Sequence, residues 1–181
     1  MVVKITYFVH GTTYDNERDI ATGWLPGELS PLGIEQSIHL GKLVGKKGFD
    51  VVFCSDLKRA VDSANLAFSD RYEIIPDRRL REVDFGDFTG LPVSKFKQRI
   101  LEYVEKPFPK GESYKDVERR VAEFLEFLKQ EHDGESVAIV AHQAPQLALE
   151  VLLNKKTWAE AFADDWRNTG AWQPGWEYVL E

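Results

Sequence analysis

Three short runs of apolar and β-branched residues, separated by helical patterns, constrain this chain more than any other feature. The runs are residues 2–9 (VVKITYFV), 50–54 (DVVFC) and 136–141 (SVAIVA). Apolar runs of this length are typical of strands that are buried on both faces of a sheet. Strands that alternate with helices favour a mostly parallel sheet covered on both faces. The expected fold class is therefore α/β, a three-layer sandwich, formed by residues 1–181 as a single domain.

Local signals predict the other elements. A hydroxyl cap and a proline at Ser30-Pro31 open a helix that ends at Gly48, with Ile34, Ile38 and Val44 on its inner face. Asp56 is expected to cap the next helix, and a further one is expected over residues 93–104. Ser113 and Asp116 resemble a capping box. The helix behind that box has an inner face of Val117, Val121, Phe124, Leu125 and Leu128. Short strands at 73–75 and 177–180 and a helix at 145–153 complete the pattern.

Charge and composition exclude several classes of partner. The formal net charge of -7 argues against nucleic acid and against an anionic membrane surface. No apolar run approaches the roughly 20 residues of a membrane span, and the first residues do not resemble a signal peptide. The single cysteine, Cys54, is expected to be a buried apolar residue. We therefore expect a cytoplasmic protein. Residues 131–181, with nine acidic against three basic side chains, are expected to be solvated surface. Their four tryptophans are expected to pack the chain end on the core, and the alternative is that one of them lines the substrate entrance or a dimer contact.

Two of the four histidines occupy equivalent places. His10 follows the first buried strand and His142 follows a later one. Sites in open α/β sheets form beyond the carboxyl ends of the strands, so both imidazoles could share one pocket. Each could instead simply cap its strand, but the matched pair favours a functional role. Arg59 follows a third strand and could grip a phosphate, or it could be a surface arginine. Glu82 lies in an irregular charged segment, and its surroundings assign it no role.

Six segments carry recognisable motifs in a fixed order. They are V-H-G-T-T-Y-D-N (9–16), S-P-L-G-I-E-Q (30–36), S-D-L-K-R-A (55–60), L-R-E-V-D-F-G-D-F-T-G (80–90), G-E-S-Y-K-D-V-E-R-R-V (111–121) and V-A-H-Q (140–143). Together they resemble the motifs of the histidine phosphatase (phosphoglycerate mutase-like) superfamily. The first resembles R-H-G-E-T-x-x-N, the third S-D-x-x-R-A and the last V-x-H-G. The resemblance extends over residues 2 to about 153.

This resemblance implies a role for each matching residue. His10 would attack phosphorus and become a phosphohistidine, while Glu82 would protonate the leaving alkoxide and later activate water. The residues implied to hold the phosphoryl oxygens are Arg59, Asn16 and His142, together with Gly11 and Thr12 beside the nucleophile. The resemblance implies neither a metal nor another cofactor. The expected partner is a small phosphorylated molecule, and the chain is expected to be a monomer or a homodimer.

The chain also departs from the family pattern. The arginine before the nucleophile is Val9, the following glutamate or glutamine is Thr12, and the glycine after the second histidine is Gln143. A lost charge-assisted hydrogen bond to phosphate costs about 1.5–3 kcal/mol, or roughly 10- to 100-fold. Either another cation replaces the missing arginine or the pocket grips phosphate more weakly. Candidate replacements are Arg18, Arg78 and Arg81. We favour the weaker grip, because none of the three lies at a position that the family uses.

The sequence therefore predicts a metal-independent phosphomonoesterase with a phosphohistidine intermediate. One alternative is a weakened family member that binds an anionic metabolite. A phosphoglycerate mutase is a third possibility, ranked last because the family's mutases carry inserted segments for which 181 residues leave little room.

Overall fold

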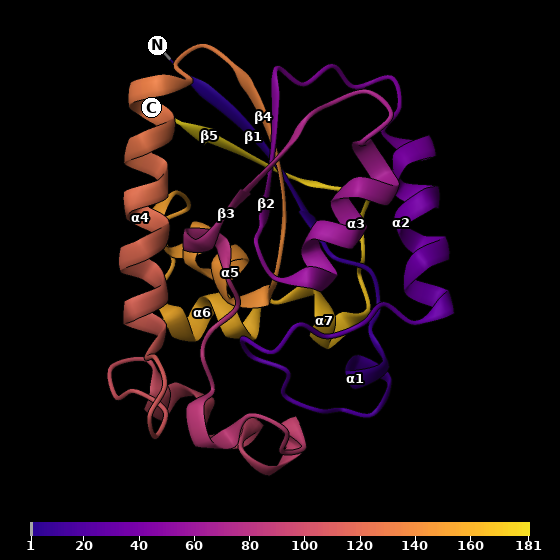
Figure 1. The fold of residues 1–181 in the computed structure, drawn as a ribbon. Coiled ribbons are helices and arrows are strands. Elements are labelled where there is room, and N and C mark those ends of the chain that lie inside the picture. Colours follow the sequence, from indigo (N-terminus) through magenta and orange to yellow (C-terminus); the bar gives the residue numbers. More distant parts are fainter. Residues whose placement is uncertain (1) are drawn as a thin grey trace.

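The computed structural model describes residues 2–181 and contains one five-stranded sheet with helices on both faces (Figure 1). The strands are β1 (Val3–Val9), β2 (Val51–Ser55), β3 (Ile74–Asp77), β4 (Ser136–Ala141) and β5 (Trp176–Leu180). Their order is β3-β2-β4-β1-β5, in which the first four are parallel and β5 pairs antiparallel with β1. The predicted α/β sandwich with a mostly parallel sheet is therefore confirmed.

Two pairs of helices form the outer layers. Helices α2 (Pro31–Leu43) and α3 (Lys58–Phe68) pack together on one face, and α4 (Tyr114–Glu131) and α5 (Gln143–Leu152) cover the other (Figure 1). Short helices α1 (Tyr14–Glu17), α6 (Trp158–Ala163) and α7 (Trp166–Thr169) lie toward the end of the molecule at which β1 and β4 finish (Figure 1). Helix α4 has the predicted capping box, and all five residues predicted for its inner face are buried.

The prediction for the inner face of α2 is wrong at two positions. Ile34 and Ile38 are 41% and 40% exposed, whereas Gly33 and Ser37 are buried. A Cβ atom on Gly33 would lie 1.9 Å from the carbonyl oxygen of Thr12. The loop after β1 therefore packs directly against the backbone of α2, and only small side chains fit between them.

Two further predictions fail because contacts between distant segments replace the expected local ones. Helix α3 has Leu57 at its N-cap without a side-chain cap, because the carboxylate of Asp56 instead accepts two hydrogen bonds from Arg81. Residues 93–104 form two 3₁₀ segments, η3 (Val93–Lys95) and η4 (Lys97–Tyr103), instead of one α-helix. Tyr103 there stacks on Phe108 at 4.1 Å between ring centroids, and such tertiary packing outweighs local helix propensity. Within residues 2–181, no helix is both long and apolar enough to cross a bilayer.

Candidate active site

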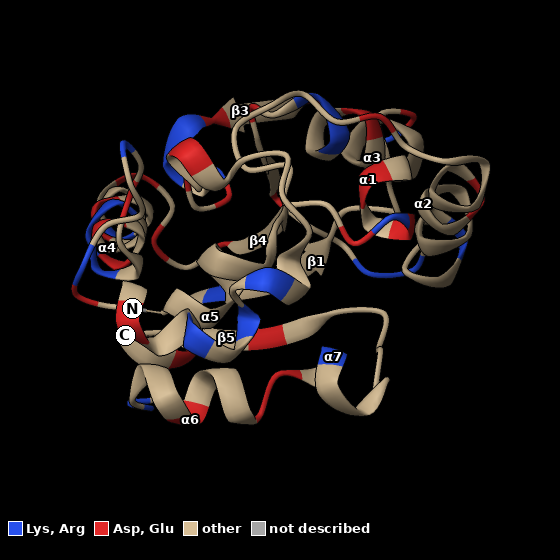
Figure 2. Cartoon of the chain, turned by 90° about the horizontal axis from the view of Figure 1, so that it is seen from below, with Lys and Arg blue, Asp and Glu red and all other residues tan. Residues whose placement is uncertain are grey.

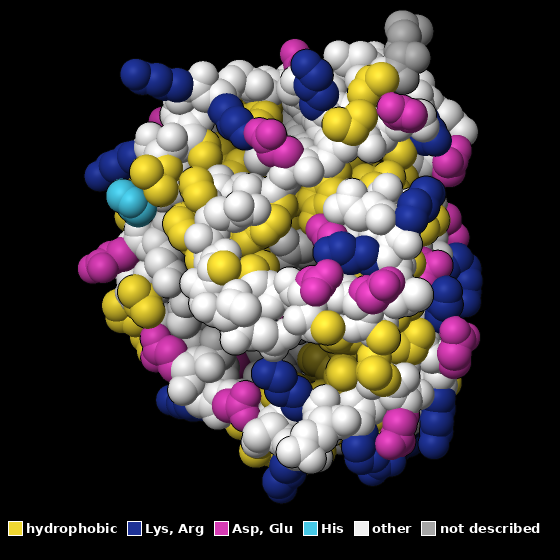
Figure 3. All heavy atoms as spheres, turned by 180° about the vertical axis from the view of Figure 1, so that it is seen from behind, with side chains coloured by type: hydrophobic (Ala, Val, Ile, Leu, Met, Phe, Trp, Pro, Cys, Tyr) yellow, Lys and Arg dark blue, Asp and Glu magenta, His cyan; other side chains and the backbone are white. Residues whose placement is uncertain are grey.

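The carboxyl ends of the parallel strands border a cleft of about 570 Å³. His10, Arg59 and Glu82 line it, and the ring of His142 packs against that of His10. Seen from this end, helices α1 to α3 lie on one side of the strand ends and α6 and α7 on the other (Figure 2). In the space-filling view from behind, hydrophobic side chains border a hollow near the lower end of the molecule (Figure 3). The structure thus brings together the four residues expected to converge.

The geometry of His10 leaves one ring nitrogen free to react. Its Nδ1 lies 2.7 Å from the carbonyl oxygen of Gly11, and a carbonyl can only accept, so Nδ1 carries the proton. Burial and then the positive charge of Arg59 lower the pKa of His10 to about 3. The ring is therefore neutral near pH 7, with its lone pair on Nε2. This is the tautomer that a nucleophilic imidazole requires.

The imidazole ring of His142 is buried, and its position is next to that of His10. Its ring centroid lies 5.0 Å from that of His10, with the planes at 62°. Neither ring nitrogen has a hydrogen-bond partner among residues 2–181. Burial, and after it the charge of Arg59, lowers the pKa of His142 well below its usual value. A buried polar group without a partner destabilises the fold by about 1–3 kcal/mol, so the two nitrogens of His142 are candidates for contacts with a ligand.

Glu82 is tied to the strand end that carries His142. Its Oε1 accepts hydrogen bonds from the N–H groups of Val83 (3.0 Å) and Ala144 (2.9 Å), and its Oε2 accepts one from Gln143 (3.2 Å). Two of these three donors belong to the first turn of α5. The irregular segment around Glu82 is therefore docked at the helix that begins directly after His142.

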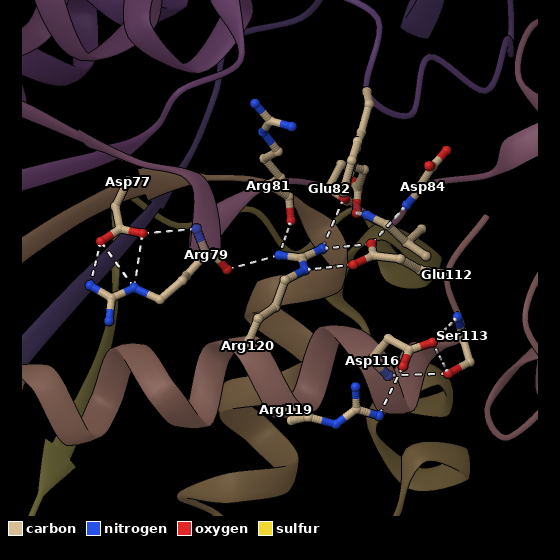
Figure 4. A network of polar contacts seen from close by, with 12 residues as sticks. Asp77, Arg79, Arg81, Glu82, Asp84, Glu112, Ser113, Asp116, Arg119 and Arg120 are labelled. Atoms are coloured by element: carbon tan, nitrogen blue, oxygen red, sulfur yellow. Dashed lines mark hydrogen bonds and ion pairs between the residues drawn. The ribbon is translucent and has the colours of Figure 1, made fainter.

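Arg120 on α4 holds the backbone that presents Glu82 (Figure 4). Its guanidinium donates to the carbonyls of Arg79 (2.8 Å), Arg81 (2.7 Å) and Glu82 (3.0 Å). Two further N–H groups bind the carboxylate of Glu112, each at 3.0 Å. Sequence reasoning assigned neither Arg120 nor Glu112, although both lie in the segment 111–121 that resembles a family motif. Arg120 and Glu112 of this motif therefore hold the backbone on which Glu82 lies.

Arg59 is almost fully buried, and its guanidinium binds the backbone of the loop over residues 23–25. Its Nη1 donates to the carbonyl of Leu25 at 2.8 Å, and its Nη2 donates to that of Gly23 at 2.9 Å. Among residues 2–181 the Nε–H of Arg59 donates to no acceptor, so it remains available as a donor. Arg59 both shapes the rim of the cleft and places a positive charge beside the two histidines.

Asn16 lines the cleft with its side chain fixed at one end. Its Oδ1 accepts a hydrogen bond from the N–H of Thr13 at 3.0 Å, as part of the capping box of α1. Within residues 2–181 its amide NH₂ group donates to no acceptor and so remains available as a donor. Among residues 2–181, no group of three or more His, Cys, Asp or Glu side chains is placed to hold a metal ion.

Gly11 and Thr12 lie outside the cleft. They line a second cavity of about 260 Å³, which His10 also borders. The N–H of Gly11 donates to Ser63 Oγ, and that of Thr12 donates to Gln36 Oε1, each at 2.9 Å. These hydrogen bonds fix the loop after β1 on the neighbouring helices. The role of both residues in phosphate binding stays a prediction.

None of the three candidate replacements for the missing arginine lines the cleft. Arg18 and Arg78 lie elsewhere, and Arg81 is held outside it by the carboxylate of Asp56, with both contacts at 2.7 Å. The guanidinium of Arg81 also lies over the ring of Trp24, 4.8 Å from its centroid. Proximity along the chain, which made the three arginines candidates, therefore does not place any of them in the cleft, in line with the preference against a replacement among them.

The C-terminal segment (residues 154–175) forms one wall of the cleft, contrary to its expected role as solvated surface. Phe162, Asp165 and Arg167 line the cleft. Trp158 packs on the core as expected, buried against Tyr114 with 5.2 Å between ring centroids. Trp172 does not: it is 48% exposed and, together with Trp166, lines a cavity that His10 also borders. No motif identified this segment, and its acidic composition did not indicate that Asp165 is buried and bound to Arg167.

The fold and this pair of histidines define a class of protein. Residues 7–173 match the family model of the histidine phosphatase superfamily (branch 1). The chain therefore belongs to the histidine phosphatase superfamily.

Its relatives include both mutases and phosphatases. A 2,3-bisphosphoglycerate-dependent phosphoglycerate mutase of Methylorubrum extorquens is 32% identical over 164 residues, which are 82% of this chain and 77% of the mutase. Phosphoserine phosphatase 1 of Hydrogenobacter thermophilus is 30% identical over 157 residues, 82% of this chain and 74% of the phosphatase. The structure of the alpha-ribazole phosphatase from Shigella flexneri superposes with a TM-score of 0.76 at 27% identity, covering 90% of this chain and 84% of that one.

Proposed function

We propose that this chain is a phosphomonoesterase that hydrolyses a small phosphorylated metabolite through a phosphohistidine on His10, without a metal ion. The observation that carries the proposal is the histidine pair: a neutral His10 with Nε2 free, packed against a buried His142 whose ring nitrogens have no hydrogen-bond partner in the described part of the chain, residues 2–181. Phosphatases among the relatives, acting by their names on phosphoserine and alpha-ribazole phosphate esters, support this reaction class.

In the first step the lone pair on Nε2 of His10 forms a bond to phosphorus while the bond to the ester oxygen breaks. The leaving alkoxide takes a proton from Glu82. Oε2 is the oxygen suited to carry that proton, because its contact with the backbone, 3.2 Å to Gln143, is the longest of the three. Arg59, Asn16 and His142 supply donors to the phosphoryl oxygens, whose charge needs preorganised partners.

In the second step the Glu82 carboxylate takes a proton from a water molecule, and the oxygen of that water attacks phosphorus. The P–N bond breaks, which returns the electron pair to Nε2 of His10 and releases inorganic phosphate. The two steps replace attack of water on a stable ester by attack on a labile P–N bond. The N–H donors of α5 and the brace from Arg120 keep Glu82 in place through both steps.

The test is release of inorganic phosphate from a panel of phosphate esters, with and without a chelator. We expect release that the chelator does not change, together with a labelled protein that is stable to alkali and labile to acid, as a phosphohistidine is. Phosphate exchange between substrate hydroxyls without net release would instead make the chain a mutase, in line with its 32% identical relative. Binding of esters without any turnover would overturn the enzymatic proposal.

A further inference from the structure

Val9 leaves the pocket without the arginine that the family places before the nucleophile. We propose that Arg167 of the C-terminal segment binds the transferred phosphoryl group in its place, and that Asp165 and Gln143 position it. This inference rests on the proposed function and adds a second cation to its phosphate site.

The placement of Arg167 leaves part of its guanidinium available. The residue lines the same cleft as His10. Its Nη1 donates to Asp165 Oδ1 at 2.9 Å and to Gln146 Oε1 at 3.4 Å, and its guanidinium lies over the ring of Trp166, 4.5 Å from the centroid. Among residues 2–181, Nε and Nη2 of Arg167 donate to no acceptor. The Nη1 group of the guanidinium is therefore fixed, and the edge formed by Nε and Nη2 can bind a tetrahedral anion.

The charge of Arg167 acts on the reacting histidines. Burial is the main cause that lowers the pKa of His10 and of His142, and Arg59 is the next. Arg167 adds to the same lowering at both rings. A cation close enough to lower the pKa of both imidazoles is also placed to attract a phosphoryl group that is bound beside them in the cleft.

The second departure from the family pattern supports the first. Gln143 stands where the family has a glycine, and its Nε2 donates to Oδ2 of Asp165. The side chain of Asp165 is only 3% exposed, and its other oxygen binds both the N–H and the guanidinium of Arg167. A glycine at position 143 could not hold this carboxylate. Hydrogen bonds thus connect the side chain of Gln143 through Asp165 to the guanidinium of Arg167.

Lys97 is the matched control for this proposal. It is the other cation besides Arg59 and Arg167 that lines the cleft within residues 2–181, and it lies on η4 with an exposed side chain. If positive charge anywhere in the cleft sufficed, neutralising Lys97 would weaken phosphate binding as much as neutralising Arg167.

The experiment measures binding of inorganic phosphate and of orthovanadate by calorimetry, together with kcat and KM on an aryl phosphate. Arg167→Met should weaken anion binding and lower kcat/KM by roughly 10- to 100-fold, as expected for one charge-assisted bond. Lys97→Met should bind phosphate like the parent. Val9→Arg alone should give no gain, whereas Val9→Arg combined with Arg167→Met should recover affinity and turnover.

Two measures keep the outcomes distinct. Arg167→Met leaves a buried carboxylate without its partner, so Arg167→Met combined with Asp165→Asn is measured in parallel, with thermal unfolding as the check on folding. Phosphate affinity unchanged in a folded variant, or no rescue by Val9→Arg, would overturn the role of Arg167 while leaving the phosphatase proposal intact. A parent protein that neither binds phosphate nor hydrolyses esters would overturn both.

Discussion

The motif-bearing part of the chain (residues 9–143) and the C-terminal segment (residues 154–175) line the same cleft, but different contacts position their side chains. The motif-bearing part places its chemical groups at strand ends or ties them to α5, as with His10 and Glu82, so their positions follow from the sheet. Residues 154–175 place Asp165 and Arg167 on a short helix held by side-chain contacts. The position of a group that directly follows a strand, such as His10, can therefore be predicted from the sheet topology, whereas Glu82, Asp165 and Arg167 reach the cleft from irregular or short segments whose position the topology does not predict.

The largest effect is expected at the centre of the motif-bearing part. His10→Ala should lower turnover of phosphate esters by roughly 10⁴-fold or more, because the variant lacks the imidazole on which the proposed covalent intermediate forms. His39→Ala, at an exposed position on α2, should leave kcat unchanged and serves as the control. Normal turnover by a folded His10→Ala protein would rule out the phosphohistidine.

Glu82→Gln tests whether the carboxylate docked on α5 is the proton donor. Alkyl phosphates, whose leaving groups need protonation, should lose roughly 10²-fold or more in kcat/KM. Activated aryl phosphates should lose much less, since their leaving groups depart without a proton. Equal losses across a series of esters with different leaving-group pKa values would argue against this role.

Arg120→Met and Arg119→Met compare the effects on stability of a partly buried and an exposed arginine of the same motif. Arg120 is 14% exposed and paired with the 17% exposed Glu112, so its loss should lower the free energy of unfolding by about 3 kcal/mol. Arg119, one residue earlier and 69% exposed, should change it by less than about 1 kcal/mol. Urea unfolding of both variants measures the difference, and similar values for the two would show that Arg120 does not brace the segment before Glu82.

The neutral state of His10 predicts a pH dependence of stability. Its pKa is about 3 when folded and about 6.5 when unfolded, so between these values the unfolded chain binds a proton that the folded protein does not. Stability should therefore fall as the pH drops below about 6.5. In His10→Ala the loss between pH 7 and pH 5 should be smaller by about 1–2 kcal/mol. Parallel pH profiles for parent and variant would show that His10 titrates normally.

The smallest effect is expected at the contact between the two parts. Gln143→Ala removes the amide that holds Asp165 and should weaken phosphate binding by about fivefold, which corresponds to a hydrogen bond of about 1 kcal/mol. Gln98→Ala, in the same cleft, is the control. If Gln143→Ala binds phosphate as tightly as the parent, Arg167 is held well enough without this contact.

The sequence by itself determined the layers, the order of motifs and the convergence of His10 with His142. Strands of a parallel sheet end at one edge, so residues that follow two neighbouring strands must meet there. The inner face of α4 was equally readable, because a period of 3.6 residues marks the buried side of a helix directly.

Only the tertiary structure decided where the remaining charged groups lie. Asp56 binds Arg81 instead of capping α3, and Arg167 reaches the cleft from a segment expected to be solvated. The physical reason is that a charged side chain in an irregular segment has no periodicity. Its position is set by partners distant in sequence, as Asp165 and Gln143 set that of Arg167, and these partners become neighbours only when the chain has folded.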